Sequence, residues 1–190
     1  MSGHGFHVHG PHDHAVEHGS QSGDNFASRI AVMTAVLSTV GALFSYSGGA
    51  TQNDAMLMKN AAAIKKTEAA NQWNYYQAKS NKQNLAELSV SLSPDANKAK
   101  YQQDVERYRA EKAEIKVAAE KLEAESRAFE QKSDEAMHLH HRWAQAMTAV
   151  QIAISLAAIS LLTRKKWLNY ATALAAGLGV VLGGAALAHL

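Results

Sequence analysis

The chain has 190 residues, a formal net charge of +2 and no cysteine, which excludes disulfide frameworks, thiolate metal sites and cysteine nucleophiles. Of its 36 acidic and basic residues, 29 lie between Asp54 and Arg142, where 15 Lys and Arg accompany 14 Asp and Glu. This balance argues against a nucleic-acid groove, which needs an excess of positive charge. We expect no nucleic-acid partner, and a solvated helical surface with local ion pairs in this region.

Residues 1–24 are rich in His and Gly and contain almost nothing that could enter a core, so we predict a disordered His-rich tail. The six histidines of this tail are His4, His7, His9, His12, His14 and His18. Several imidazoles close together suit borderline metals, and we therefore consider Zn, Cu or Ni as ligands for storage or sensing. The alternative is a solvated tail whose histidines do nothing specific.

Residues 25–48 form the first apolar segment, and Arg29 is its only formal charge. A bilayer core about 30 Å thick needs roughly 20 helical residues, so this segment predicts a first transmembrane helix. The sequence before it lacks the ordered regions of a secretory signal, and we expect a retained anchor. Gly48 and Gly49 predict an end or a bend of the helix at that point.

Residues 49–142 are rich in Ala, Glu, Lys and Gln, which favour helix. Ser93 followed by Pro94 predicts the start of a second helix, because proline lacks only an N–H that would be unpaired there. The region is therefore expected to be an extramembrane helical hairpin with its tip near residues 92–97.

Both arms of this hairpin show a seven-residue repeat that predicts a coiled-coil seam. The repeat of the first arm runs through Leu57, Ile64, Asn71, Ala78, Leu85 and Leu92. That of the second arm runs through Tyr101, Tyr108, Ile115, Leu122, Phe129 and Ala136. The positions four after the first five of these also belong to the repeat and are mostly small or polar: Val105, Lys112, Ala119, Ser126 and Ser133. Because these seams hold few large apolar side chains, we expect other copies of the chain to supply further helices, which predicts a homo-oligomer.

Residues 143–190 predict a transmembrane hairpin, with helices at 144–162 and 167–187 joined by a basic turn at 163–166. Positive residues in short loops stay on the cytoplasmic side, which places Arg164, Lys165 and Lys166 there. The number of spans then predicts a cytoplasmic N-terminus and a periplasmic coiled-coil region, for a protein of the inner membrane of a bacterium.

Five residues are candidates for interaction. Trp73, Tyr75 and Tyr76 form an aromatic cluster that can dock the second arm or a partner, and we favour packing within the hairpin, for example against Phe129.

Gly179 and Gly183 belong to a ladder of small residues, a pattern that lets helix backbones approach closely in lipid. We therefore expect the third span to pack onto another span at these glycines.

A second histidine cluster, His138, His140 and His141, comes directly before the second span. His138 and His141 lie on one helical face, so the cluster is a candidate for metal binding or pH sensing. We favour the alternative that these side chains are anchors at the membrane interface.

Two segments carry a family resemblance. One is Gln72-Trp73-Asn74-Tyr75-Tyr76-Gln77-Ala78-Lys79, and the other runs from His138 to Leu168 as HLHHRWAQAMTAVQIAISLAAISLLTRKKWL. With them the chain resembles domain-of-unknown-function family 4337, uncharacterised bacterial membrane proteins with three spans. The resemblance implies this layout with a helical insert, and it implies no activity.

The sequence thus predicts an all-α membrane protein with three transmembrane helices and a long antiparallel coiled-coil hairpin between the first and second. We expect a non-enzymatic protein that self-assembles as a scaffold or envelope-organising element, with membrane lipid, its own copies and other envelope proteins as candidate partners. No phosphate loop, nucleophile elbow or metalloprotease motif occurs in the sequence. The alternatives are a metal-binding or metal-responsive membrane protein that uses the His-rich tail, and an oligomeric channel.

Overall fold

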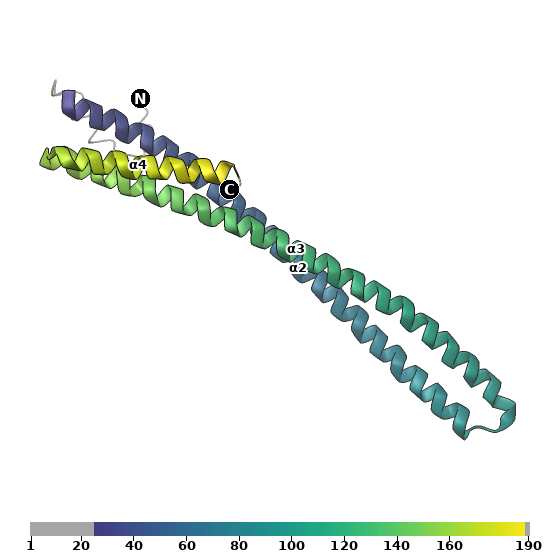
Figure 1. Ribbon diagram of the computed structural model, residues 1–190. Helices are drawn as coiled ribbons and strands as arrows, with labels where there is room; N and C mark the ends of the chain where they lie inside the picture. Colours follow the sequence, from purple (N-terminus) through teal and green to yellow (C-terminus); the bar gives the residue numbers. More distant parts are fainter. Residues whose placement is uncertain (1–24, 189–190) are drawn as a thin grey trace, which may run out of the picture. The chain divides into compact units, whose positions relative to one another are not determined.

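The computed structural model describes residues 25–188, which form three helices and their short connections (Figure 1). Helix α2 runs from Asn25 to Leu92, α3 from Asp95 to Thr163 and α4 from Lys166 to Leu187. The described residues contain no strand, so the all-α class expected from the sequence is confirmed. Each helix contains a stretch that is long and apolar enough to cross a membrane.

The chain divides into two compact units. The bundle unit comprises, among the described residues, 25–53 and 136–188, and the hairpin unit comprises residues 54–135. The bundle unit contains parts of α2 and α3 together with α4, whereas the hairpin unit contains only α2 and α3.

Helix α2 continues without interruption through Gly48 and Gly49, so the helix end expected at these glycines is wrong. Glycine costs about 1 kcal/mol in a helix relative to alanine, and packing must offset this cost. A β-carbon on Gly48 would lie 3.3 Å from Cβ of Trp143, which shows how closely α3 approaches. The Gly48 carbonyl also accepts a hydrogen bond of 2.8 Å from Nδ1 of His140. These contacts from α3 hold this turn of α2 in place.

The core of the bundle unit is centred on Val150 of α3, which is fully buried. Leu37 of α2 and Ala153 and Ile154 of α3 complete this cluster. Partly buried side chains that pack around the cluster are Met33, Val40, Phe44, Ala175 and Ala176, so all three helices contribute to it.

Only Arg164 and Lys165 connect α3 to α4. Arg164 adopts the left-handed backbone conformation, with φ of 54°, which commonly ends a helix. Across this turn, the buried hydroxyl of Ser160 in α3 donates a hydrogen bond to the side-chain oxygen of Asn169 in α4. The two ends are thus joined by both the backbone and a side-chain contact.

At the other connection, α2 ends at Leu92 and α3 begins at Asp95. The Pro94 carbonyl accepts a hydrogen bond of 3.0 Å from the backbone N–H of Asn97. Pro94 therefore stands directly before the first helical residue, one position earlier in the helix start than the sequence suggested, within the usual uncertainty of helix ends.

The two arms of the hairpin unit pack against each other along a seam of mostly small residues. The buried residues of this seam are Ala55, Ala62, Ala69 and Ala86 of α2 and Val105, Ile115, Ala119, Ser126 and Ser133 of α3. The α3 members belong to the repeat expected for the second arm.

The seam expected for the first arm is wrong, because its repeat faces outward. All six of its residues are exposed: Leu57, Ile64, Asn71, Ala78, Leu85 and Leu92. Alanine replaces them at the contact, and alanine lets the helices come close enough for two buried serines to bond across it. Ser126 donates to the carbonyl of Ala62 at 2.9 Å, and Ser133 donates to the carbonyl of Ala55 at 2.8 Å.

Candidate functional site

Small residues predominate inside the described part of this protein, whereas many of its large apolar side chains are exposed. Among residues 25–188, 20 apolar residues are buried, and 12 of these are alanine. The largest fully buried side chains among the described residues are only Val150, Thr172 and Ser160. Soluble domains normally bury their Leu, Ile, Val and Phe side chains. Because this distribution is inverted, the outer surface is the candidate functional site.

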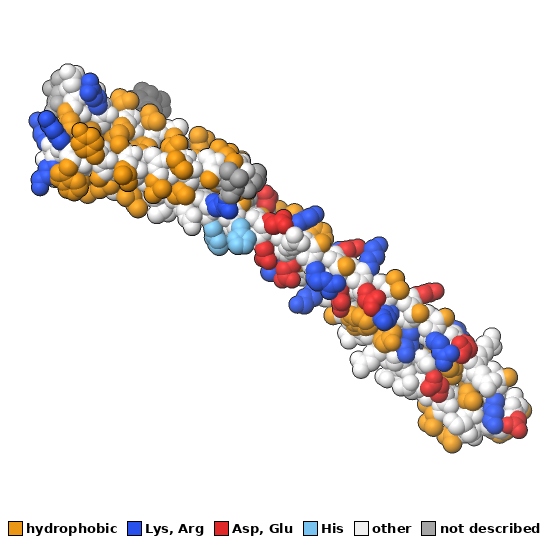
Figure 2. Space-filling model, viewed as in Figure 1, with side chains coloured by type: hydrophobic (Ala, Val, Ile, Leu, Met, Phe, Trp, Pro, Cys, Tyr) orange, Lys and Arg blue, Asp and Glu red, His pale blue; other side chains and the backbone are white. Residues whose placement is uncertain are grey.

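On the bundle unit, large apolar side chains are exposed on all three helices (Figure 2). They include Val32, Val36 and Leu43 of α2, Ile152, Ile159 and Leu162 of α3, and Leu174, Leu178 and Val181 of α4. Figure 2 shows hydrophobic side chains gathered over the bundle unit, whereas acidic and basic side chains are interspersed over the hairpin unit. Soluble monomers rarely expose so many large apolar side chains together. Such surfaces are typical of sites that contact a membrane or another protein.

Gly179 and Gly183 allow α4 to pack closely on the other two helices. A β-carbon on Gly179 would lie 2.8 Å from Cγ2 of Val150 in α3. One on Gly183 would collide with the ring of Phe44 in α2, at 2.7 Å from Cε1 and 2.8 Å from Cε2. The two glycines therefore contact other helices of their own chain. Sequence reasoning found the glycines but missed both partners, because an apolar side chain within an apolar segment carries no distinguishing signal.

Trp73 and Tyr76 are used inside the hairpin unit. The indole N–H of Trp73 donates a hydrogen bond of 2.7 Å to Oε1 of Glu123 in α3. The rings of Trp73 and Tyr76 meet edge to face with their centroids 5.6 Å apart, and the ammonium group of Lys112 lies 4.9 Å from the Tyr76 ring. Glu123 was not anticipated from the sequence, where Phe129 was the expected neighbour.

Tyr75 behaves differently from its two neighbours. Half of its surface remains exposed, and its ring lies beneath the ammonium group of Lys79 at 5.1 Å. The same ammonium group lies 5.6 Å from the ring of Tyr108 in α3. Of the three aromatic residues singled out from the sequence, Tyr75 is thus the one that stays open to an outside partner.

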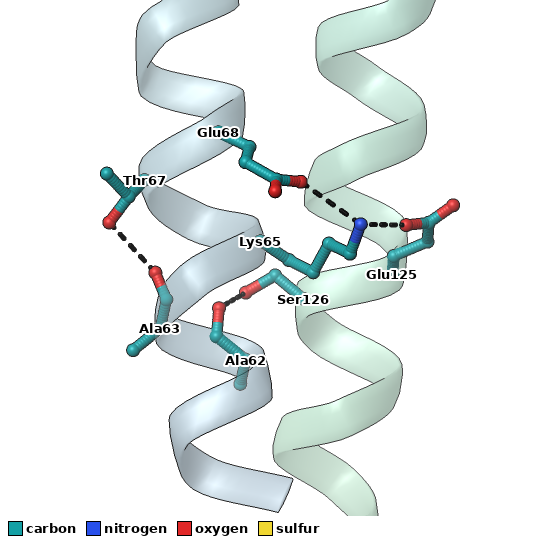
Figure 3. A network of polar contacts seen from close by, with 7 residues as sticks. All are labelled: Ala62, Ala63, Lys65, Thr67, Glu68, Glu125 and Ser126. Atoms are coloured by element: carbon teal, nitrogen blue, oxygen red, sulfur yellow. Dashed lines mark hydrogen bonds and ion pairs between the residues drawn. The ribbon is translucent and has the colours of Figure 1, made fainter.

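Ion pairs between the two arms run along the hairpin unit. Lys59 contacts Glu130 at 2.8 Å, and Lys79 contacts Glu111 at 2.5 Å. Lys65 reaches Glu68 of its own helix at 3.0 Å and Glu125 of the other arm at 3.3 Å (Figure 3). In the same turn Ser126 bonds to the Ala62 carbonyl (Figure 3), so that polar and packing contacts between the arms coincide.

The pair of Lys79 and Glu111 is the least exposed of these, with 14% and 33% of the side-chain surfaces accessible. The hydrogen bond from Lys79 lowers the pKa of the Glu111 carboxyl, and the charges of Lys79 and Arg107 add to this effect. The hydrogen bond to Glu111 raises the pKa of Lys79, and Tyr75 contributes in the same direction. Both groups therefore stay charged over a wider pH range than they would in an unfolded chain.

The candidate metal ligands His4, His7, His9, His12, His14 and His18 lie outside the described residues. Within residues 25–188, no three His, Asp or Glu side chains are placed to hold a metal ion together. His140 instead bonds to the Gly48 carbonyl, a contact that sequence reasoning missed because the two residues are 92 positions apart. His138 and His141 are exposed.

Arg164, Lys165 and Lys166 are all exposed and lie together where α3 turns into α4. They form a compact basic cluster at one end of two apolar helices, which is the geometry in which positive residues determine topology.

Comparison with known proteins identifies the family. The sequence family described as "Domain of unknown function (DUF4337)" matches residues 26–189, which covers all three helices. Searches among curated proteins and solved structures found no match to this chain. The chain belongs to the DUF4337 family.

Proposed function

We propose that this protein is a non-enzymatic, membrane-anchored helical scaffold, whose bundle unit is held in a bilayer and whose hairpin unit self-associates. The observation that carries the proposal is the inverted distribution of side chains, with alanine, glycine and serine at the helix contacts and large apolar residues on the surface.

For the bundle unit, a bilayer is the environment that suits this surface. Burying a Leu, Ile or Val side chain away from water is worth about 1.5–3 kcal/mol, and the exposed residues of this kind occur on every helix. In lipid, apolar side chains on the outside cost nothing, and helices associate through close packing of small residues. The contacts of Gly179 and Gly183 are of this type.

For the hairpin unit, the balanced charges suit water and the thin seam suits self-association. Alanine and serine bury little apolar area, so the two arms alone gain little from packing. Large apolar side chains such as Leu57, Ile64 and Leu85 are more than half exposed on the same unit. A further helix from another copy would bury them.

The basic cluster supports an orientation. With Arg164, Lys165 and Lys166 on the cytoplasmic side, α2 enters from the cytoplasm and the hairpin unit lies on the opposite side, which is the periplasm for a bacterial inner membrane. In that position the protein would organise or space components of the envelope.

Two measurements test the proposal together. After expression in a Gram-negative bacterium, the protein should stay in the membrane pellet after carbonate extraction, and its native mass in mild detergent should be a multiple of the 20.5 kDa chain. Release by carbonate would refute the anchor, and a strictly monomeric mass would refute self-assembly.

The lack of native cysteine makes orientation directly measurable, because an introduced cysteine is the only thiol. An Asn97→Cys variant at the hairpin tip should react in intact spheroplasts with a reagent that cannot cross the membrane, and a Lys165→Cys variant should react only after lysis. The reverse pattern would overturn the orientation.

A further inference from the structure

The outward face of α2 in the hairpin unit contains no charged residue. We define this neutral face by three series of positions that start at Met56, Leu57 and Asn60 and continue every seven residues as far as Leu92. The three series together contain 17 residues. The neutral face consists of Met56, Leu57, Asn60, Ala63, Ile64, Thr67, Ala70, Asn71, Asn74, Gln77, Ala78, Asn81, Asn84, Leu85, Leu88, Ser91 and Leu92. All 17 are exposed, and the face extends for roughly 55 Å of helix.

The charges of the same arm are confined to the other side. Its eight charged residues are Asp54, Lys59, Lys65, Lys66, Glu68, Lys79, Lys82 and Glu87. Each occupies a position in or beside the seam with α3, and Lys59, Lys65 and Lys79 pair with carboxylates of α3 across it. The absence of charge is thus specific to the outward side of this helix, because the same arm carries eight charged residues on its other side.

The outward face of α3 provides the comparison within the molecule. It carries exposed charged residues, among them Glu106, Arg107, Glu114, Glu120, Lys121 and Arg127. The two helices of the hairpin therefore differ, because the outward face of α3 carries charged residues and that of α2 carries none. A helix face with apolar residues at a seven-residue spacing is typical of packing against another helix.

We propose that a second copy of this chain pairs in parallel with the first through the neutral face of α2. This inference rests on the proposed function, since copies anchored in one membrane enter their hairpin units at the same point of α2. In a parallel pair in register, the residues of the face nearest the two-fold axis meet their own counterparts.

Self-pairing explains why the face is neutral. A Lys or Glu on it would meet an identical charge, which is destabilising, whereas an Asn amide can both donate to and accept from its counterpart. Asn60, Asn71, Asn74 and Asn81 are self-complementary in this sense. Leu57, Ile64, Leu85 and Leu88 supply the apolar contacts on either side, and an Asn within such a seam fixes the register. A different partner protein would have no need of this neutrality.

Disulfide formation between single cysteines tests the pairing on the full chain in detergent or nanodiscs. Ile64→Cys and Leu85→Cys lie three repeats apart, about 30 Å along the helix, and both form same-site disulfides only if the helices run parallel and in register. On mild oxidation both variants should give covalent dimers. The exposed controls Lys66→Cys, on the other side of α2, and Lys121→Cys, on α3, should stay monomeric.

Opposite charges at one position give a second test that does not depend on oxidation. Asn71→Lys and Asn71→Glu chains should each show a dimer dissociation constant raised by at least about tenfold, because like charges face each other at the interface. Mixing the two chains should restore association. The matched Ala124→Lys and Ala124→Glu chains on α3 should associate like the parent.

The outcomes separate this inference from the proposed function. A parent oligomer with no disulfide at positions 64 and 85, or with equal disulfide yield at the control positions, overturns pairing through the neutral face and leaves self-assembly standing. A monomeric parent that is retained in the membrane overturns both the pairing and self-assembly. Loss of association in both charged chains without restoration on mixing overturns the parallel register.

Discussion

Gly179 of α4 lies so close to Val150 of α3 that an added β-carbon would meet the valine at 2.8 Å and the Ala146 carbonyl at 3.3 Å. Val150 is fully buried and the Ala146 carbonyl is part of the backbone, so relief by a simple side-chain movement is not available. The contact fixes the spacing of the two helices in the bundle unit.

The Gly179→Ala variant should be less stable than the parent by about 1–3 kcal/mol, the range typical of overpacking. Thermal unfolding of the full chain in detergent measures this effect. Gly177→Ala is the matched control, because a β-carbon there meets nothing within 4 Å, and the higher helix propensity of alanine should leave stability unchanged or raise it by up to about 1 kcal/mol. Equal effects at both glycines would contradict the close packing.

Gly183→Ala should destabilise the same unit through Phe44 instead. Replacing the ring by a smaller side chain in a Gly183→Ala, Phe44→Leu double variant should recover part of the lost stability. We expect a coupling free energy of about 1 kcal/mol or more between the two sites. The same melting experiment on the two single variants and the double variant gives this coupling. Strictly additive losses would mean that the ring and the glycine do not share a contact.

The bond from Trp73 to Glu123 should contribute to the pairing of the two arms. Trp73→Phe removes the N–H donor and Glu123→Ala removes the acceptor, and a double-mutant cycle should yield a coupling of about 0.5–1.5 kcal/mol. Hydrogen exchange of the hairpin amides in the full chain reports the stability of this unit. As a control, Trp73→Phe combined with Glu114→Ala, which lies on the exposed side of α3, should be additive.

Acid should weaken the hairpin unit through Glu111. Because its pKa in the folded chain is below the ordinary value of 4.5, the stability that this carboxylate contributes is present above 4.5 and is lost as the pH falls through the folded pKa. The raised pKa of Lys79 has the opposite sign, so its contribution is complete below 10.5 and is lost as the pH rises through its folded pKa. The contribution of the ion pair to the stability of the hairpin unit is therefore constant from mildly acidic to mildly alkaline pH.

A Glu111→Gln variant should be less stable than the parent at neutral pH and should approach it as the pH falls well below 4.5. Hydrogen exchange or thermal unfolding over a pH series measures the difference. If the two profiles stay parallel across the acidic range, the ion pair does not contribute to stability.

The sequence was sufficient for the two connections between the helices, because the signals there are local. The only Pro of the central region, Pro94, and the dense charge of Arg164, Lys165 and Lys166 lie at the two connections between helices. The second-arm repeat also pointed to the face of α3 that packs, since Val105, Ile115 and Ala119, which are buried there, belong to it.

The first arm misled because α2 carries two repeats of seven on opposite faces. Leu57 and Ile64 are more apolar than Ala55 and Ala62, and a single helix offers no reason to prefer the alanines. The decision depends on α3, whose Ser126 and Ser133 need the carbonyls of Ala62 and Ala55, and whose carboxylates need Lys59 and Lys79. The continuation of α2 through Gly48 depends likewise on His140, which is distant in sequence.

The connection between α3 and α4 has a consequence for biogenesis. Arg164 and Lys165 can span at most about 7 Å even when fully extended. In the proposed bilayer arrangement, the end of α3 and the start of α4 must therefore lie at the same membrane surface, where the Ser160–Asn169 contact joins them. The two helices would then complete their insertion as one hairpin, after α2, which precedes them in the chain.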